Sequence, residues 1–75
     1  MARFALINYS LVRQHIASVH REGCADIAKD ARDHGGQVEI IEANTAAEVV
    51  TGWINAEMTE LGYTIHDVKV LPCCR

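Results

Sequence analysis

Residues 44–62 read NTAAEVVTGWINAEMTELG, and this stretch decides the fold because it predicts a long amphipathic helix. Thr45 is followed three residues later by Glu48, the spacing of a capping box that satisfies amides of the first helical turn. Apolar residues then recur at spacings of three and four, which places them on one helical face. These residues are Ala47, Val50, Ile54, Met58 and Leu61. Gly62 follows where a left-handed cap ends a helix, so we expect a helix over residues 45–61.

A shorter helix is predicted over about residues 24–34, because its apolar residues recur at helical spacing. They are Cys24, Ile27, Ala28 and Ala31. The charged residues between them, Asp30 included, are expected to face water. The glycines at 35–36 end this helix.

Four segments are predicted to be strands. QVEIIE at 37–42 alternates apolar and polar residues and is rich in β-branched side chains. RFALIN at 3–8 and RQHIASVH at 13–20 have a similar character, although a helix over residues 10–20 is an alternative for the second. YTIHDVKVLP at 63–72 ends on a proline, and its alternation slips in the middle, so its strand is expected to start late or to carry a bulge.

The resulting order of elements is β-β-α-β-α-β, and it predicts an α/β fold. Strands that alternate with helices favour crossover connections and a sheet covered by helices. We expect one small domain over residues 1–75, a two-layer sandwich whose two helices cover one face of a sheet of three to four strands. The other face would then be polar or meet a partner, which makes a homodimer a reasonable expectation.

Size and charge narrow the classes of function. The chain has 75 residues and a formal net charge of −3, without a stripe of Lys or Arg, so nothing favours binding to nucleic acid. No apolar run approaches the roughly 18 residues that span a membrane. A core of this size supplies only about 3–5 kcal/mol, so a metal, a disulfide or a partner is a common addition. We expect a soluble cytoplasmic protein with protein partners.

A histidine and two cysteines form the candidate metal site. His20 and Cys24 lie four residues apart, where a strand end and a helix start can aim both side chains at one point. A final strand parallel to the strand that ends at His20 would bring Cys73 to the same end of the sheet. Zinc accepts such a mixture of ligands in tetrahedral geometry. His20, Cys24 and Cys73 are therefore candidate zinc ligands, with His66 or solvent as the fourth.

Three other interpretations of the cysteines stay open. Cys24 at the first position of a helix would have a stabilised thiolate, as a thiol-dependent enzyme or redox protein requires. A disulfide between Cys24 and Cys73 or Cys74 would close a long loop and stabilise a small fold. In the simplest interpretation the cysteines are ordinary thiols, and Cys24 packs as a small hydrophobic residue.

Two further features could serve binding. Trp53 is a candidate interface residue because tryptophan is enriched at binding hot spots, with core packing on its helix as the alternative. Glu39 and Glu42 on the predicted strand, with Glu48 nearby, could bind a cation, and the alternative is a solvated face.

The segments VHREGCADIAKDA and VLPCC, at residues 19–31 and 70–74, resemble parts of small uncharacterised proteins of actinobacteria and their bacteriophages. The shared patterns are V-H-x-x-G-C-x-D-I and L-P-C, together with a central capped helix that contains tryptophan. The resemblance implies no known activity. It does imply that His20, Cys24 and Cys73 meet in space.

We therefore expect a small non-enzymatic accessory protein of a phage-like kind, which acts by binding another protein or itself. A zinc-binding structural domain is the alternative, and a thiol-dependent enzyme or redox protein that uses Cys24 is the third hypothesis.

Overall fold

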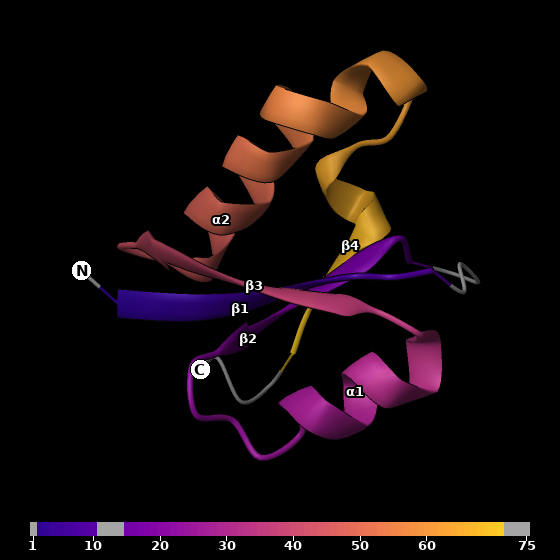
Figure 1. The fold of residues 1–75 in the computed structure, drawn as a ribbon. Helices are drawn as coiled ribbons and strands as arrows, with labels where there is room; N and C mark the ends of the chain where they lie inside the picture. Colours follow the sequence, from indigo (N-terminus) through magenta and orange to yellow (C-terminus); the bar gives the residue numbers. More distant parts are fainter. Residues whose placement is uncertain (1, 11–14, 72–75) are drawn as a thin grey trace.

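The computed structural model describes residues 2–10 and 15–71 of the chain. The elements are β1 (Ala2–Asn8), β2 (Ala17–Arg21), α1 (Ile27–His34), β3 (Gln37–Ala43), α2 (Ala46–Trp53) and β4 (Val68–Val70). Figure 1 shows one four-stranded sheet with helices packed against it. The α/β class and the β-β-α-β-α-β order are confirmed.

The sheet has the strand order β3-β1-β2-β4. β1 is antiparallel to both of its neighbours, and β4 is parallel to β2. The strands β2, β3 and β4 therefore run in one direction and β1 in the other. β3 and β4 are the two edges of the sheet.

The two helices lie on opposite faces of the sheet, not on one face as expected (Figure 1). One face, here called the α2 face, carries Phe4, Leu6 and Val19 in the apolar core. The other, the α1 face, carries the alternate residues, among them Ile7 and its cross-strand partner Ser18. The crossover from β2 to β3 and the crossover from β3 to β4 traverse the sheet in opposite directions. Crossovers of one hand that run in opposite directions place their helices on opposite faces.

The helix α2 begins as its sequence predicts. The Thr45 side-chain oxygen accepts a hydrogen bond from the Glu48 amide at 3.2 Å. The Glu48 carboxylate accepts one at 2.9 Å from the amide of Asn44, one residue before the cap. Beyond Trp53 the helical path continues through a π-helical turn, Ile54–Met58, and a 3-10 turn to Leu61. The predicted helical span of 45–61 is therefore confirmed.

The helix α1 begins at Ile27, three residues later than predicted. Gly23 adopts a φ of 88° and the Cys24 amide bonds to the Arg21 carbonyl at 3.0 Å, so Cys24 lies in a turn before the helix. At the other end, a Cβ atom on Gly36 would collide with the Ile7 side chain. The chain can therefore pass this close to β1 only because residue 36 is glycine.

The two segments with open predictions are strands where the structure describes them. Residues 17–21 form β2, which excludes a helix there, and residues 11–14 lie outside the described part. In the last segment a 3-10 turn, Ile65–Asp67, precedes β4, so this strand starts late as expected. In the described ranges no helix is long and apolar enough to cross a membrane.

Candidate functional site

A cluster of polar side chains joins α1 to the sheet, and Asp30 is its centre. The Asp30 cluster comprises Asp30 and His34 of α1, Ser18 and His20 of β2, and Tyr9 just after β1. Tyr9 donates to Asp30 Oδ1 at 2.8 Å, and Ser18 donates to Oδ2 at 2.6 Å. His20 Nε2 lies 2.7 Å from Oδ2, and His34 Nδ1 lies 2.8 Å from Oδ1. The His34 ring also stacks on the Tyr9 ring, with centroids 4.1 Å apart.

Local structure brings these side chains together. Ser18 and His20 are alternate residues of β2, so both point to the α1 face. Asp30 and His34 are four residues apart on α1 and share one helical face with Ile27 and Ala31. The prediction that Asp30 faces water was therefore wrong, because α1 crosses the sheet directly over Ser18 and His20.

The cluster holds Asp30 in its ionised form. Burial raises the pKa of its carboxyl, but hydrogen bonds from Ser18, His20 and Tyr9 outweigh burial and hold the pKa below its usual value. Because an ionised carboxylate only accepts hydrogen bonds, His20 Nε2 must carry a hydrogen. Burial, together with the Asp30 charge, raises the pKa of Tyr9 to about 12.

The chemistry of the Asp30 cluster is that of a structural joint. The Asp30 carboxylate bonds to three donors, Tyr9, Ser18 and His20, and most of its acceptor positions are therefore engaged within the protein. His34 Nδ1 lies close to both Oδ1 and the Asp30 carbonyl oxygen, at 2.8 and 3.0 Å. Ser18 donates to the aspartate, whereas a serine nucleophile donates to its histidine base. Ser18 and His20 are both 0% exposed. In this arrangement the side chains of Asp30, Ser18 and His20 bond to one another, and those of Ser18 and His20 are not accessible to a substrate.

Two of the three predicted zinc ligands, His20 and Cys24, lie in the described part of the chain, and each has another bonding partner. His20 is committed to Asp30 through Nε2, and Cys24 is disulfide-bonded. Cys73 and Cys74 lie outside the described residues. β4 is parallel to β2, and the Leu71 amide bonds to the Val19 carbonyl at 3.1 Å, so the chain does run toward the His20 end. Over residues 2–10 and 15–71, no three His, Cys, Asp or Glu side chains are grouped to hold a metal.

The disulfide state of Cys24 bears on two of the hypotheses. A sulfur in a disulfide is neither a thiolate ligand nor a nucleophile, so zinc binding and thiol catalysis would each require reduced Cys24. Cys24 also lies before the first turn of α1, where the helix dipole acts less than at the predicted first helical position. Disulfides persist in oxidising compartments, whereas the sequence led us to expect a protein of the reducing cytoplasm.

Trp53, the predicted interface residue, packs in the core. It is 7% exposed and lies with Val49 and Ile54 against the α2 face. Its indole nitrogen donates to Glu57 at 3.0 Å. The alternative given with it, core packing, is the arrangement that the structure has.

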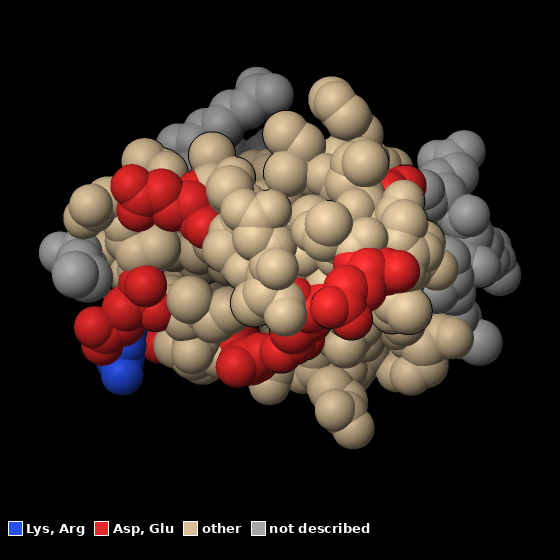
Figure 2. Space-filling view, turned by 90° about the horizontal axis from the view of Figure 1, so that it is seen from above, with Lys and Arg blue, Asp and Glu red and all other residues tan. Residues whose placement is uncertain are grey.

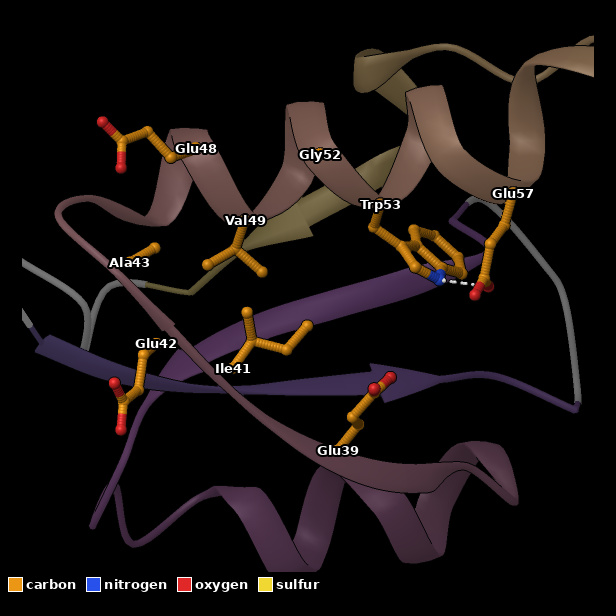
Figure 3. A pocket seen from close by; sticks show the side chains of 9 residues that line it. All are labelled: Glu39, Ile41, Glu42, Ala43, Glu48, Val49, Gly52, Trp53 and Glu57. Atoms are coloured by element: carbon orange, nitrogen blue, oxygen red, sulfur yellow. Dashed lines mark hydrogen bonds between the residues drawn. The ribbon is translucent and has the colours of Figure 1, made fainter.

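A groove lies between β3 and α2, and this acidic groove was not foreseen as a unit. Its volume is about 330 Å³. Ile41 and Val49 point toward one another in it, and the Trp53 indole and Glu57 lie at one end (Figure 3). Four glutamates line it, namely Glu39, Glu42, Glu48 and Glu57. Three of them had been singled out on the sequence as a possible cation site.

The open edge of the sheet lies beside this groove. β3 is seven residues long and pairs only with β1, so its outer side has no strand partner in the described part of the chain. Val38 and Ile40, on its α1 face, are 46% and 47% exposed. An edge strand with exposed backbone groups is a template for pairing with another chain.

Comparisons of the chain with protein-family models, with curated proteins and with solved structures found no match.

Proposed function

We propose that this protein is a small non-enzymatic accessory protein, of the phage-like kind that its sequence resembles, and that it acts by self-association through β3. The observation that carries the proposal is the edge strand itself. β3 is seven residues long, the backbone groups on its outer side have no strand partner in the described part of the chain, and its aliphatic side chains Val38 and Ile40 are about half exposed. In a stable monomer such a strand is usually short, covered or interrupted.

The sequence of β3 suits pairing with a second copy. If two copies pair antiparallel about a two-fold axis at Ile40, each Ile40 meets the other. Val38 then lies opposite Glu42, and Glu39 lies opposite Ile41 of the other copy. No glutamate faces a glutamate, and like charges directly opposite are what destabilises strand pairs. The aliphatic side chains would lose exposed surface on the α1 face of the joined sheet.

The Asp30 cluster supports a role without catalysis. Its carboxylate is bonded to Tyr9, Ser18 and His20, and Ser18 and His20 are buried beneath α1. The exposed edge of β3 and its aliphatic side chains serve binding more readily than bond chemistry.

Native mass spectrometry and sedimentation velocity of the wild type and of Ile40→Lys test the proposal. The substitution puts two lysines opposite one another across the axis, so we expect a wild-type dimer and a dissociation constant about tenfold or more weaker in the variant. Leu61→Lys is the matched control, because Leu61 is 67% exposed and belongs to the 3-10 turn Thr59–Leu61, a segment that lies away from β3 (Figure 1). A wild type that stays monomeric at all concentrations, or equal dimerisation of both variants, overturns self-association through β3.

The same spectra, recorded under reducing conditions before and after a chelator, test the zinc hypothesis. We expect the mass of the chain without metal and no change on chelation. One zinc per chain, lost together with the folded charge states, would replace the proposal with a zinc-binding structural domain.

A further inference from the structure

The acidic groove is built from two elements that share a single chain. β3 contributes Glu39 and Ile41 from its α2 face, and the helical run contributes Val49, Trp53 and Glu57 (Figure 3). Its volume of about 330 Å³ is at the lower end of the range of roughly 300–1,000 Å³ found for ligand pockets. The groove therefore has room for one or two long side chains and little more.

Among the carboxylates that line the groove, those of Glu48 and Glu57 accept hydrogen bonds within the chain, and that of Glu39 does not. Glu57 accepts a hydrogen bond from the Trp53 indole, and Glu48 accepts one from the backbone at the start of α2. These bonds use one acceptor position each, so both groups keep capacity for another donor. Glu39 has no hydrogen bond or ion pair within the described ranges, and its residue is exposed.

The charge around the groove is of one sign. In Figure 2, which views the molecule from the α2 side, acidic side chains run across the face and a basic group is visible only at one edge. No Lys or Arg lines the groove itself. Arg3 reaches one of the groove residues, Glu42, at 3.8 Å, but both side chains are more than half exposed, so this pair neutralises little.

The combination of an apolar floor and an acidic rim selects one kind of occupant. The aliphatic stem of arginine or lysine covers apolar surface while its charged head stays at the rim. Arginine in particular donates to carboxylates through two parallel bonds. Phosphate groups and acidic side chains are repelled from the groove. In a chain whose β3 is not paired with a second copy, the adjacent open edge of β3 favours a partner segment in extended conformation.

We propose that the acidic groove is a docking site for an extended, arginine-bearing segment of a different protein. Alternate side chains of an extended segment point to one side, so two arginines two positions apart would both face the groove, where Glu39 and Glu57 point toward one another (Figure 3). The groove is complete within one chain, and this site therefore does not depend on the proposed self-association.

The test measures binding of a blocked peptide of alternating arginine and threonine by isothermal titration calorimetry. Glu39→Lys is compared with Glu60→Lys, which makes the same change in net charge at an exposed position outside the groove. We expect Glu39→Lys to weaken binding by roughly five- to tenfold more than Glu60→Lys does. Neither glutamate has a structural partner in the described residues, so both variants should fold.

Three outcomes separate the possibilities. Equal effects of the two substitutions, or equal affinity for a peptide of alternating glutamate and threonine, overturn the groove as the docking site. Binding by the Ile40→Lys variant at wild-type strength supports a site within one chain. If the wild type dimerises and does not bind the arginine peptide, the groove proposal fails and the self-association proposal stands.

Discussion

The two faces of the sheet hold their helices in different ways. α2 has three buried residues, Val49, Val50 and Trp53, which lie in one apolar core with side chains of β1, β2 and β4. α1 has no fully buried residue, and the carboxylate of Asp30 bonds it to side chains of the sheet. Apolar contacts have no preferred direction and tolerate small shifts, whereas hydrogen bonds from three side chains to one carboxylate fix a single position.

The two faces should therefore contribute differently to the free energy of unfolding and to the position of the helix that covers each of them. The apolar core on the α2 face supplies most of the buried area and should set the free energy of unfolding. The Asp30 cluster sets where α1 lies, because the donors to Asp30 are Tyr9, just after β1, and Ser18 and His20 of β2. We therefore expect substitutions on the α2 face to lower the stability of the whole fold, and substitutions in the Asp30 cluster to loosen α1.

The largest effect is expected for Trp53→Ala. Removing a buried tryptophan costs about 3–5 kcal/mol, which equals the whole stability expected of so small a core. We expect a largely unfolded chain by circular dichroism, and a urea midpoint near zero. Leu61→Ala, at a position 67% exposed, is the control and should change stability by less than about 0.5 kcal/mol. A cooperative urea transition of Trp53→Ala near the wild-type midpoint would show that the α2 face does not dominate.

A smaller and more local effect is expected for Asp30→Asn. The amide can accept from fewer donors than the carboxylate, so buried donors of Ser18 or His20 lose their partner at a cost of about 2–3 kcal/mol. Amide hydrogen exchange should accelerate first in α1, residues 27–34, while α2 stays protected. Asp33→Asn, an exposed aspartate on the same helix, is the control.

Low pH should weaken the same hydrogen bonds, because it protonates the Asp30 carboxylate. The hydrogen bonds hold the Asp30 pKa below its ordinary value, so its stabilisation is present above that ordinary value, about 3.9, and is lost as the pH falls below it. Asp30→Asn should lose less stability than the wild type over this acidic range. If amide hydrogen exchange of Asp30→Asn accelerated equally in α1 and α2, a local role of Asp30 in holding α1 would be contradicted.

The smallest effect is expected for Tyr9→Phe, which removes one bond of the cluster and keeps the ring stacked on His34. The cost should be about 1 kcal/mol at neutral pH. The Tyr9 pKa, raised by burial to about 12 from 10.0, gives stability that is present below pH 10 and lost as the pH rises toward 12. The wild type should therefore lose more stability than Tyr9→Phe across this alkaline range. Tyr63→Phe, at a partly exposed tyrosine, should leave the alkaline loss unchanged.

Residues 45–61 show how much of the fold could be predicted from the sequence. The Thr45 cap and the apolar spacing act within a few residues of chain, so neighbouring residues alone specify them. The α/β order follows from the same kind of local pattern. Residue 24 shows the limit, since Cys24 continues an apolar helical spacing but lies in a turn that Gly23 imposes with a φ of 88°.

The candidate sites were only partly predictable. Glu39, Glu42 and Glu48 stood out as a group, but the groove exists only because α2 folds back over β3. Asp30 read as a solvent-facing residue on its helix. One signal pointed the other way, since Ser18 and His20 occupy one face of a strand and two buried polar side chains need a partner.

By itself, the sequence predicted the helices, three of the strands and the order of elements, because local spacing and caps depend on residues close together in the chain. It left residues 10–20 open between strand and helix. Only the tertiary structure decided the strand order, the placing of α1 and α2 on opposite faces, and the union of Asp30 with Tyr9, Ser18 and His20. The reason is physical. A helical charge is solvent-exposed or buried according to what the helix crosses, and that depends on contacts between residues distant in the chain.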